Sequence, residues 1–310
     1  MKKISVLVPT YNEQDNVAPL SEKIAEQFRD HLRDYDYELI FIDNDSTDDT
    51  RAVIRGLCSA DPRIKAIFNA RNFGQISSPY YGLLQSTGDC VIGICADFQD
   101  PVEMIPEFVK EWEAGYKIVL GQKTSSKESK VKYALRSFYY RFMTKNSDVK
   151  FIEHVTGFGL YDREFIDILR SLDDTRPFIK GVIAEMGYKI KLIPYEQPKR
   201  KSGKSKNKMA QSYDFAVQGI TAYTKKGVRI AVGAGVLFML VSIIAIIGCG
   251  IYKLFNWGSF DFWSVGFNLF ILFVLSLQTL FIGVIGEYVL DINSRLKKRP
   301  LVIESERINF

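Results

Sequence analysis

Short apolar runs alternate with longer stretches of mixed apolar and polar residues through the first two thirds of the chain. The short runs have the length of strands, and the longer stretches have the apolar spacing of helices. Strands are predicted at 4–8, 37–42, 64–68, 90–96, 118–120 and 189–194, with helices at 17–32, 101–113 and 178–187 and two more ending near 57 and 86. This alternation predicts an α/β fold with a mostly parallel sheet and helices on both faces.

Two long apolar segments, 230–252 and 265–289, fill most of the last third of the chain. Each can cross a hydrocarbon core of about 30 Å at a rise of about 1.5 Å per residue. We therefore predict a C-terminal two-helix transmembrane hairpin; a buried soluble hairpin is the alternative. Basic residues outside the connecting loop place both termini in the cytoplasm. The expected regions are a cytosolic domain at 1–207, an amphipathic interface helix at 208–229, the two spans within 230–289 and a cytosolic tail at 290–310.

The net charge is +5, and the lysines and arginines gather at 123–145, 199–208, 225–229 and 295–299. This distribution favours a lipid bilayer or a phosphate group as partner over a nucleic acid. The four cysteines lack the spacing of a disulfide framework or a zinc site. The first strand begins near residue 1 without a signal peptide. Both features predict a reducing, cytosolic environment for the polar domain.

Carboxylate and carboxamide side chains follow two of the predicted strands. Asp97 and Gln99 come directly after the run 90–96, and Asp43 follows the run 37–42. Ligands of open α/β sheets bind at the carboxyl ends of strands, and oxygen ligands suit a hard divalent cation. Asp97 and Gln99 are therefore candidates for a cation site, and Asp43 is a candidate for a ligand contact. A polar turn at a strand end is the alternative.

Other polar residues of these segments have a structural explanation. Asp100 can cap the helix that follows it. Asp45, Ser46 or Thr47 can cap the helix that ends near residue 57. Asp162 can cap the helix that directly follows it in the chain. We expect these residues to stabilise helix ends.

Four motifs occur in a fixed order: Val-Pro-Thr-Tyr-Asn-Glu at 8–13, Asp-x-x-Ser-x-Asp-x-Thr at 43–50, Arg-Asn-Phe-Gly at 71–74 and Ala-Asp-Phe-Gln-Asp-Pro at 96–101. Together they resemble the inverting GT-A glycosyltransferases of family 2. The branch they resemble uses polyprenyl phosphate and includes dolichol-phosphate mannose synthases and bactoprenol glucosyltransferases. The resemblance continues through a strand at 155–163 to the C-terminus. It implies the Rossmann-like GT-A fold for the cytosolic domain.

The resemblance also implies roles for single residues. In the family, the nucleoside is held at the positions of Pro9, Tyr11, Glu13 and Asp43. Asp97 and Gln99 match the positions that hold a divalent metal, Mg²⁺ or Mn²⁺, on the donor diphosphate. We therefore expect Asp97 to be essential for catalysis.

The chain departs from the family pattern at three places. Asn44 and Asp45 replace the usual second aspartate and glycine. The usual Asp-x-Asp begins here with Cys95, whose soft sulfur is a poor magnesium ligand; we interpret Cys95 as a buried strand residue. Phe158 replaces an aspartate that is proposed as a base in many relatives. A phosphate acceptor has a second pKa of about 6, so it is largely anionic at neutral pH and needs little base catalysis.

A basic segment at 200–206 matches the family pattern Arg-x-x-Gly-x-Ser-Lys. We expect Arg200 and Lys206 to act in the transfer step and Ser205 to contact a phosphate, either of the lipid or of the leaving diphosphate. A solvated basic loop is the alternative. Residues 129–143 predict a basic helix that either faces the membrane or is solvated.

The sequence thus predicts a membrane-anchored, metal-dependent, inverting glycosyltransferase. It would transfer a hexose from a nucleotide sugar, preferably UDP-glucose, to undecaprenyl phosphate at the cytoplasmic face of the inner (plasma) membrane. The polyprenyl-phosphate sugar would serve cell-envelope glycan modification. A non-catalytic nucleotide-binding membrane module and a processive polysaccharide synthase are the alternatives. The sequence leaves open the sugar, the metal requirement, any general base and a homo-oligomer formed through Asn268 and Gln278.

Overall fold

The structure is a computed structural model of the 310-residue chain. It describes residues 1–125, 155–175, 177–198, 261–297 and 299–310, and single residues at 141, 152, 237, 240, 241, 244, 251 and 255. The chain divides into two compact units. The first combines Met1–Arg141, Val149–Met209 and Lys297–Phe310, and the second combines Phe142–Asp148 and Ala210–Leu296.

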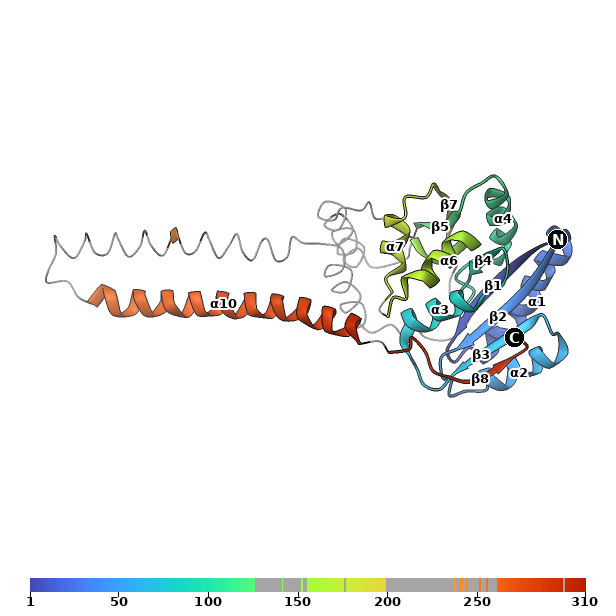
Figure 1. Ribbon diagram of the computed structural model, residues 1–310, viewed down its shortest axis with the longest axis horizontal. Helices are drawn as coiled ribbons and strands as arrows, with labels where there is room; N and C mark the ends of the chain where they lie inside the picture. Colours follow the sequence, from blue (N-terminus) through green and yellow to red (C-terminus); the bar gives the residue numbers. More distant parts are fainter. Residues whose placement is uncertain are drawn as a thin grey trace. The chain divides into compact units, whose positions relative to one another are not determined.

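An eight-stranded sheet forms the centre of the first unit (Figure 1). Its strands are β1 (Lys2–Thr10), β2 (Tyr35–Asp43), β3 (Ile64–Asn69), β4 (Cys90–Gly93), β5 (Ile118–Ser125), β6 (Val155–Asp162), β7 (Ile190–Glu196) and β8 (Glu304–Ile308). Their order across the sheet is β7-β5-β6-β4-β1-β2-β3-β8. Of these strands, β6 and β8 run opposite to the rest, because they pair antiparallel with their neighbours. The predicted mostly parallel α/β sheet is confirmed.

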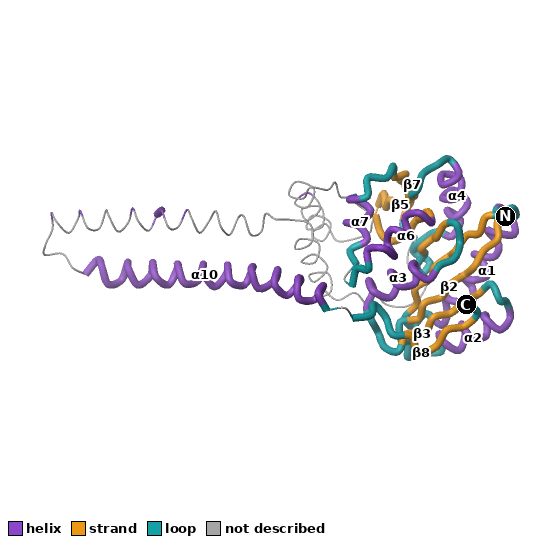
Figure 2. The backbone as a smooth tube through the Cα atoms, viewed as in Figure 1, coloured by secondary structure: helices purple, strands orange, loops and turns teal. Residues whose placement is uncertain are grey.

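Helices cover both faces of the sheet (Figure 2). They are α1 (Gln14–His31), α2 (Thr50–Ala60), α3 (Gly74–Gln85), the short 3₁₀ helix η1 (Val102–Met104), α4 (Ile105–Glu113), α6 (Arg163–Leu172) and α7 (Ile179–Glu185). Strand side chains alternate between the two faces. Val6 and Val8 therefore pack with α1, α2 and α4, whereas Leu7 packs with α3, α6 and α7.

A strand from the C-terminal segment completes one edge of the sheet. β8 pairs antiparallel with β3, and the carbonyl of Ile303 accepts a hydrogen bond from Ala70 N at 2.8 Å. Asn309 Nδ2 donates to the carbonyls of Cys58 and Ile64 at 2.8 Å each. The sequence predicts only a tail at 290–310. Its five-residue strand carries charged side chains and gives no local signal strong enough to distinguish it from a solvated tail.

The second unit contains α10 (Asp261–Leu296), a helix of 36 residues. Its segment Phe273–Leu290 has a mean hydropathy of 1.8 and is the one candidate membrane span found among the described residues. The segments 208–229 and, apart from single positions, 129–143 and 230–252 lie outside those residues. The interface helix, the basic helix, the hairpin and the region boundaries therefore remain predictions.

Candidate functional site

The carboxyl ends of β1, β2, β3 and β4 lie at the same edge of the sheet. In the strand registers, Asp43 pairs with Thr10 on one side and with Phe68 on the other, and Gly93 pairs with Leu7. Three of the loops that follow contain a non-glycine residue with positive φ, Asn12 (55°), Asp45 (66°) and Phe98 (58°), and the loop after β3 ends at Gly74 (87°), the first residue of α3. Non-glycine residues adopt this region rarely, and such conformations cluster at functional sites. This edge is the candidate site.

The two predicted metal-binding residues belong to one tight turn after β4. Asp97 is 7% exposed, and its Oδ1 accepts a hydrogen bond from Gln99 N at 3.1 Å. Phe98, between them, has the left-handed conformation that closes this turn. The backbone thus orients the Asp97 carboxylate at the candidate site.

Two predictions about the same loop are wrong. β4 already ends at Gly93, and Cys95 is exposed rather than buried in the strand. Asp100 caps no helix, because its carboxylate accepts hydrogen bonds from Cys95 N at 3.0 Å and from the Tyr195 hydroxyl at 3.2 Å. Pro101 is instead the N-cap residue of η1. The loop folds back on itself and buries Asp100, and this burial raises the pKa of its carboxyl group despite the hydrogen bonds from Cys95.

Asp43 is buried at the end of β2 and binds the protein through both carboxylate oxygens. Oδ1 accepts a hydrogen bond from the Ser46 hydroxyl, and Oδ2 accepts one from Ser46 N at 3.1 Å and one from Arg51 Nε at 2.6 Å. Arg51 also donates to the carbonyl of Asn69 at 2.6 Å. Asp43 therefore organises the loops after β2 and β3. Its contact with a nucleoside stays a prediction.

The helix after β2 begins further along the chain than the predicted cap residues. α2 starts at Thr50, whose backbone N and Oγ1 both donate to Asp48 Oδ1, at 3.1 and 2.5 Å. The prediction that Asp45, Ser46 or Thr47 caps this helix is therefore wrong, since these residues precede its first turn. These residue types are common at helix N-caps, but the loop between β2 and α2 is longer than the sequence suggests.

Pro9, Tyr11 and Glu13 lie at the end of β1 and in the loop to α1, and each is partly exposed. The carboxylate of Glu13 accepts a hydrogen bond from Asn16 Nδ2 at 2.6 Å. Glu13 N donates to Thr50 Oγ1 at 2.8 Å, which joins this loop to the start of α2. The structure thus brings these residues to the candidate edge. Their contacts with a nucleoside remain predictions.

Asn44 joins the loops after β2 and β3, although the sequence does not single it out as a site residue. Its Nδ2 donates to Asn72 Oδ1 and to the carbonyl of Gly74, at 3.1 Å each. Its Oδ1 accepts from Asn69 Nδ2 at 3.0 Å and from Phe73 N at 2.8 Å. The departure from the usual aspartate was a signal, but one sequence does not show its partners.

Phe158 is a core residue. Its ring packs against Phe108 and Tyr195 with centroids 4.8 and 5.4 Å apart. Asp162, at the other end of β6, caps α6 as predicted and accepts a hydrogen bond from Glu164 N at 3.0 Å. Neither residue provides a general base at the candidate edge.

Within the described part of the chain, no group of three or more His, Cys, Asp or Glu side chains is placed to hold a metal ion. A magnesium site that shares substrate phosphates needs only one or two protein carboxylates. The oxygen atoms of Asp97 and Gln99 fit that type of site. Arg200, Ser205 and Lys206 lie outside the described residues, so their roles stay predictions.

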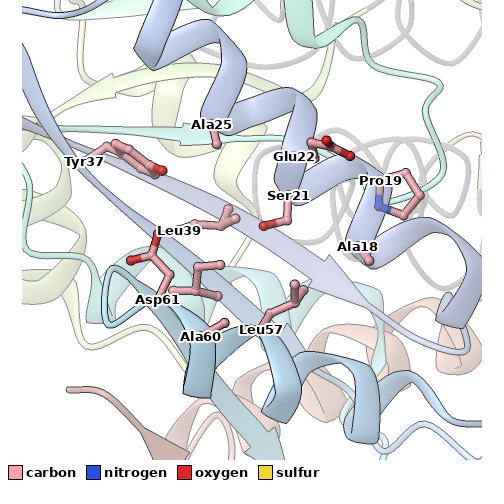
Figure 3. Close-up of a pocket in the computed structure, with 11 residues that line it drawn as sticks. Ala18, Pro19, Ser21, Glu22, Ala25, Tyr37, Leu39, Leu57, Ala60 and Asp61 are labelled. Carbon is pink, nitrogen blue, oxygen red and sulfur yellow. The ribbon is translucent and has the colours of Figure 1, made fainter.

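A hollow of about 480 Å³ opens between α1 and α2 (Figure 3). Ser21 of α1, Leu39 of β2 and Leu57 of α2 are among its lining residues. None of the predicted site residues lines it. The hollow is therefore separate from the candidate site.

Residues 5–169 match the model of Glycosyl transferase family 2, and the chain belongs to this family. It is 33% identical over 297 residues to the Putative glycosyltransferase CsbB of Bacillus subtilis (strain 168), with 96% of this chain and 89% of that protein covered.

Two further relatives match nearly from end to end. The Prophage bactoprenol glucosyl transferase homolog of Escherichia coli (strain K12) is 30% identical over 305 residues, covering 97% of this chain and 98% of that protein. The Bactoprenol glucosyl transferase of Shigella phage SfX is 30% identical over 309 residues, covering 98% and 99%. Among solved structures, the mannosyltransferase PcManGT from Pyrobaculum calidifontis in complex with GDP-Man and Mn²⁺ has a TM-score of 0.47 and 19% identity, covering 71% of this chain and 62% of that chain. A similarity of that size supports no conclusion about ligands.

Proposed function

We propose that this protein transfers a hexose from a nucleotide sugar to undecaprenyl phosphate at the cytoplasmic face of the membrane. The preferred donor is UDP-glucose, and the products are a polyprenyl-phosphate sugar and a nucleoside diphosphate. One observation carries the proposal. The similarity to bactoprenol glucosyl transferases covers 97% and 98% of the chain and therefore extends through the apolar helix α10.

The arrangement of the strand ends supports a nucleotide-sugar donor. β1 and β2 are neighbours, so Pro9 and Asp43 lie at adjacent strand ends. Nucleotides bind at this edge of open α/β sheets. We assign the nucleoside to the loops after β1 and β2, with Tyr11 and Glu13 contributing. We assign the diphosphate to the loop after β4, on the other side of β1.

Asp97 and Gln99 would hold a Mg²⁺ or Mn²⁺ ion on the donor diphosphate. Their oxygen atoms suit a hard cation, and Gln99 N already orients the Asp97 carboxylate. When bound, the ion would offset the negative charge of the leaving diphosphate. Because Cys95 is a poor ligand for such ions, Asp97 supplies most of the protein's charge at this position.

A phosphate acceptor fits a site without a carboxylate at position 158. The second pKa of a phosphate monoester is about 6, so the attacking oxygen is largely anionic at neutral pH. Such a nucleophile needs orientation and nearby cations more than a general base. We assign these tasks to Arg200, Ser205 and Lys206. The spans at 230–252 and 265–289 would keep the site close to the lipid headgroups.

The role of Arg200 can be tested by steady-state kinetics on the detergent-solubilised protein. We expect Arg200→Ala to raise the KM for the lipid acceptor about tenfold, as for one lost charge-assisted hydrogen bond, and to leave the KM for the donor nearly unchanged. Lys199→Ala is the matched control, because it removes the neighbouring cation. Equal effects of Arg200→Ala on both substrates would contradict the assignment.

The function is tested by transfer from radiolabelled UDP-glucose, UDP-galactose, UDP-N-acetylhexosamine and GDP-mannose to undecaprenyl phosphate, with and without EDTA. We expect one donor to give a lipid-soluble product that is lost when EDTA is added. A product that survives EDTA would overturn the metal assignment but keep the transfer reaction. Binding of a nucleotide without transfer from any donor would overturn the proposal and favour a non-catalytic nucleotide-binding module.

A further inference from the structure

We propose that Asn44 is a positioning residue for the donor site, because it fixes the segment 69–74 against the end of β2. This inference rests on the proposed function, and it adds the segment 69–74 to the donor site proposed there. Asn44 is 8% exposed and follows directly after Asp43, at the candidate edge. The segment carries the Arg-Asn-Phe-Gly motif and leads into α3.

The side-chain amide of Asn44 uses its full hydrogen-bonding capacity on this one segment. An amide has two N–H donors and two acceptor positions on its oxygen. Both donors bind the segment, at Asn72 and at the carbonyl of Gly74, and both acceptor positions bind it, at Asn69 and at Phe73 N. The main-chain partners determine which way the amide points, because Phe73 N can only donate and the Gly74 carbonyl can only accept.

Asn44 holds the segment at the point where the chain changes direction. Gly74 has a φ of 87° and begins α3, and its N donates to Asn72 Oδ1 at 2.9 Å. The exposed guanidinium of Arg71 lies 4.0 Å from the centre of the Phe73 ring. By binding Phe73 N and the Gly74 carbonyl, Asn44 therefore fixes the backbone that orients this cation.

The segment is also held from two other directions. Arg51 donates to the carbonyl of Asn69, and Ala70 N donates to the carbonyl of Ile303 next to β8. These contacts hold the beginning of the segment. Among the described residues, the side chain of Asn44 joins the beginning of the segment, at Asn69, to the end of the segment, at Gly74. Loss of the Asn44 amide should consequently loosen the end of the segment without unfolding the sheet.

A carboxylate at position 44 cannot replace the amide. In Asn44→Asp, an acceptor oxygen would face the carbonyl of Gly74 at the present 3.1 Å, where a donor is required. Asn72 could turn its own N–H groups toward the new carboxylate. It would then lose the hydrogen bond that it now accepts from Gly74 N. The substitution therefore leaves at least one unfavourable contact, although it restores a residue that is usual in the family.

Asn309→Asp is the matched control. Asn309 also donates from its amide to two main-chain carbonyls, those of Cys58 and Ile64. Ile64 is the first residue of β3, so these contacts lie at the opposite end of that strand from the candidate site. Both variants exchange an amide for a carboxylate and lose the same kind of hydrogen bond. A general effect on stability should therefore appear in both.

The first test is hydrogen exchange of the full-length protein without ligand. We expect the Gly74 amide to exchange about tenfold faster in Asn44→Asp, as for one lost hydrogen bond, because Asn72 turns its oxygen away from Gly74 N. In Asn309→Asp, the Gly74 amide should exchange at the unmodified rate. Asn72→Ala should also accelerate exchange of the Gly74 amide, because it removes the acceptor of Gly74 N. Unchanged exchange of the Gly74 amide in Asn44→Asp would overturn the proposal.

The second test is the affinity of the same proteins for UDP with Mn²⁺, and for GDP with Mn²⁺ as a second probe. We expect Asn44→Asp to weaken binding of the preferred nucleotide about fivefold to tenfold, and Asn309→Asp to leave it unchanged. Faster exchange with unchanged affinity would make Asn44 structural only and would overturn the positioning role. If the unmodified protein binds neither nucleotide, the proposed function itself fails, whatever the exchange data show.

Discussion

Different interactions hold the chain together at the amino ends and at the carboxyl ends of the parallel strands. At the amino ends of the strands, the buried carboxylate of Glu38 lies 3.0 Å from Lys3 Nζ and 2.8 Å from Lys65 Nζ. It also accepts hydrogen bonds from Ser5 Oγ at 2.5 Å and Thr87 N at 2.7 Å. At the carboxyl ends, uncharged side chains such as Asn44 make many of the connections between loops.

This difference indicates that the amino ends of the strands stabilise the fold, whereas the carboxyl ends are suited to bind a ligand. Both oxygens of Glu38 are occupied by the protein. The loops at the carboxyl edge contain left-handed residues such as Phe98, an exposed Cys95 and the oriented carboxylate of Asp97. Backbone strain persists only where the surrounding structure holds it. Amide side chains such as Asn12 and Asn44 supply part of that support without adding charge.

The largest expected effect is on activity at the carboxyl edge. Asp97→Asn should reduce transfer at least about a hundredfold, because it removes the main carboxylate proposed for the metal. Asp89→Asn is the control at the amino end of β4, where Asp89 Oδ2 accepts from Lys3 N at 2.7 Å. It should keep near-normal activity. Radiolabel transfer and thermal unfolding of both variants provide the check, and an active Asp97→Asn variant would remove Asp97 from the metal site.

The next effect is on stability at the amino edge. Glu38→Gln leaves Lys65 and Lys3 without their buried partner, and loss of one member of such a pair costs about 3 kcal/mol. We expect Tm to fall by roughly 6–12 °C, with little change in activity per folded molecule. Calorimetry and transfer assays at low temperature measure the two quantities. A large loss of activity without a loss of stability would show that the two edges are not separate in function.

Acid pH should weaken the same network. Burial raises the pKa of Glu38, but hydrogen bonds from Lys65, Ser5 and Thr87 outweigh this effect and lower the pKa from its ordinary value of 4.5 to about 2. A carboxylate with a lowered pKa stabilises the fold above its unfolded pKa and loses this contribution as the pH falls toward the folded value. The difference in unfolding free energy between the unmodified protein and Glu38→Gln should therefore shrink between pH 4.5 and 2. A constant difference over this range would contradict the lowered pKa.

The smallest effect is expected at β8. Glu306 pairs with Arg55 at 2.6 Å, but the two side chains are 39% and 46% exposed. Exposed pairs contribute less than about 1 kcal/mol, so Glu306→Gln should lower Tm by no more than roughly 2–4 °C. Thermal unfolding in low and high salt measures this contribution. A much larger shift would mean that docking of the C-terminal strand depends on this one pair.

The amino-acid sequence by itself determined the elements of the sheet and the type of residue at its carboxyl edge. Strand and helix periodicity are local properties, so six of the strands were predicted from the pattern, with shifted ends. The resemblance to the family added the strand at 155–163. Asp97 and Gln99 are also close in the chain, and their presence in one loop followed from the sequence. The same local pattern identified Asp162 as the cap of α6.

Tertiary structure alone decided which polar groups bind one another. Asn44 binds Asn69 and Gly74, 25 and 30 positions away, because β2 and β3 end side by side. Asp100 binds the Tyr195 hydroxyl, 95 positions away, instead of capping the next helix. β8 forms because the C-terminal segment reaches the open edge of β3. Periodicity describes one element at a time, whereas the partner of a hydrogen bond depends on the register and neighbourhood of separate elements.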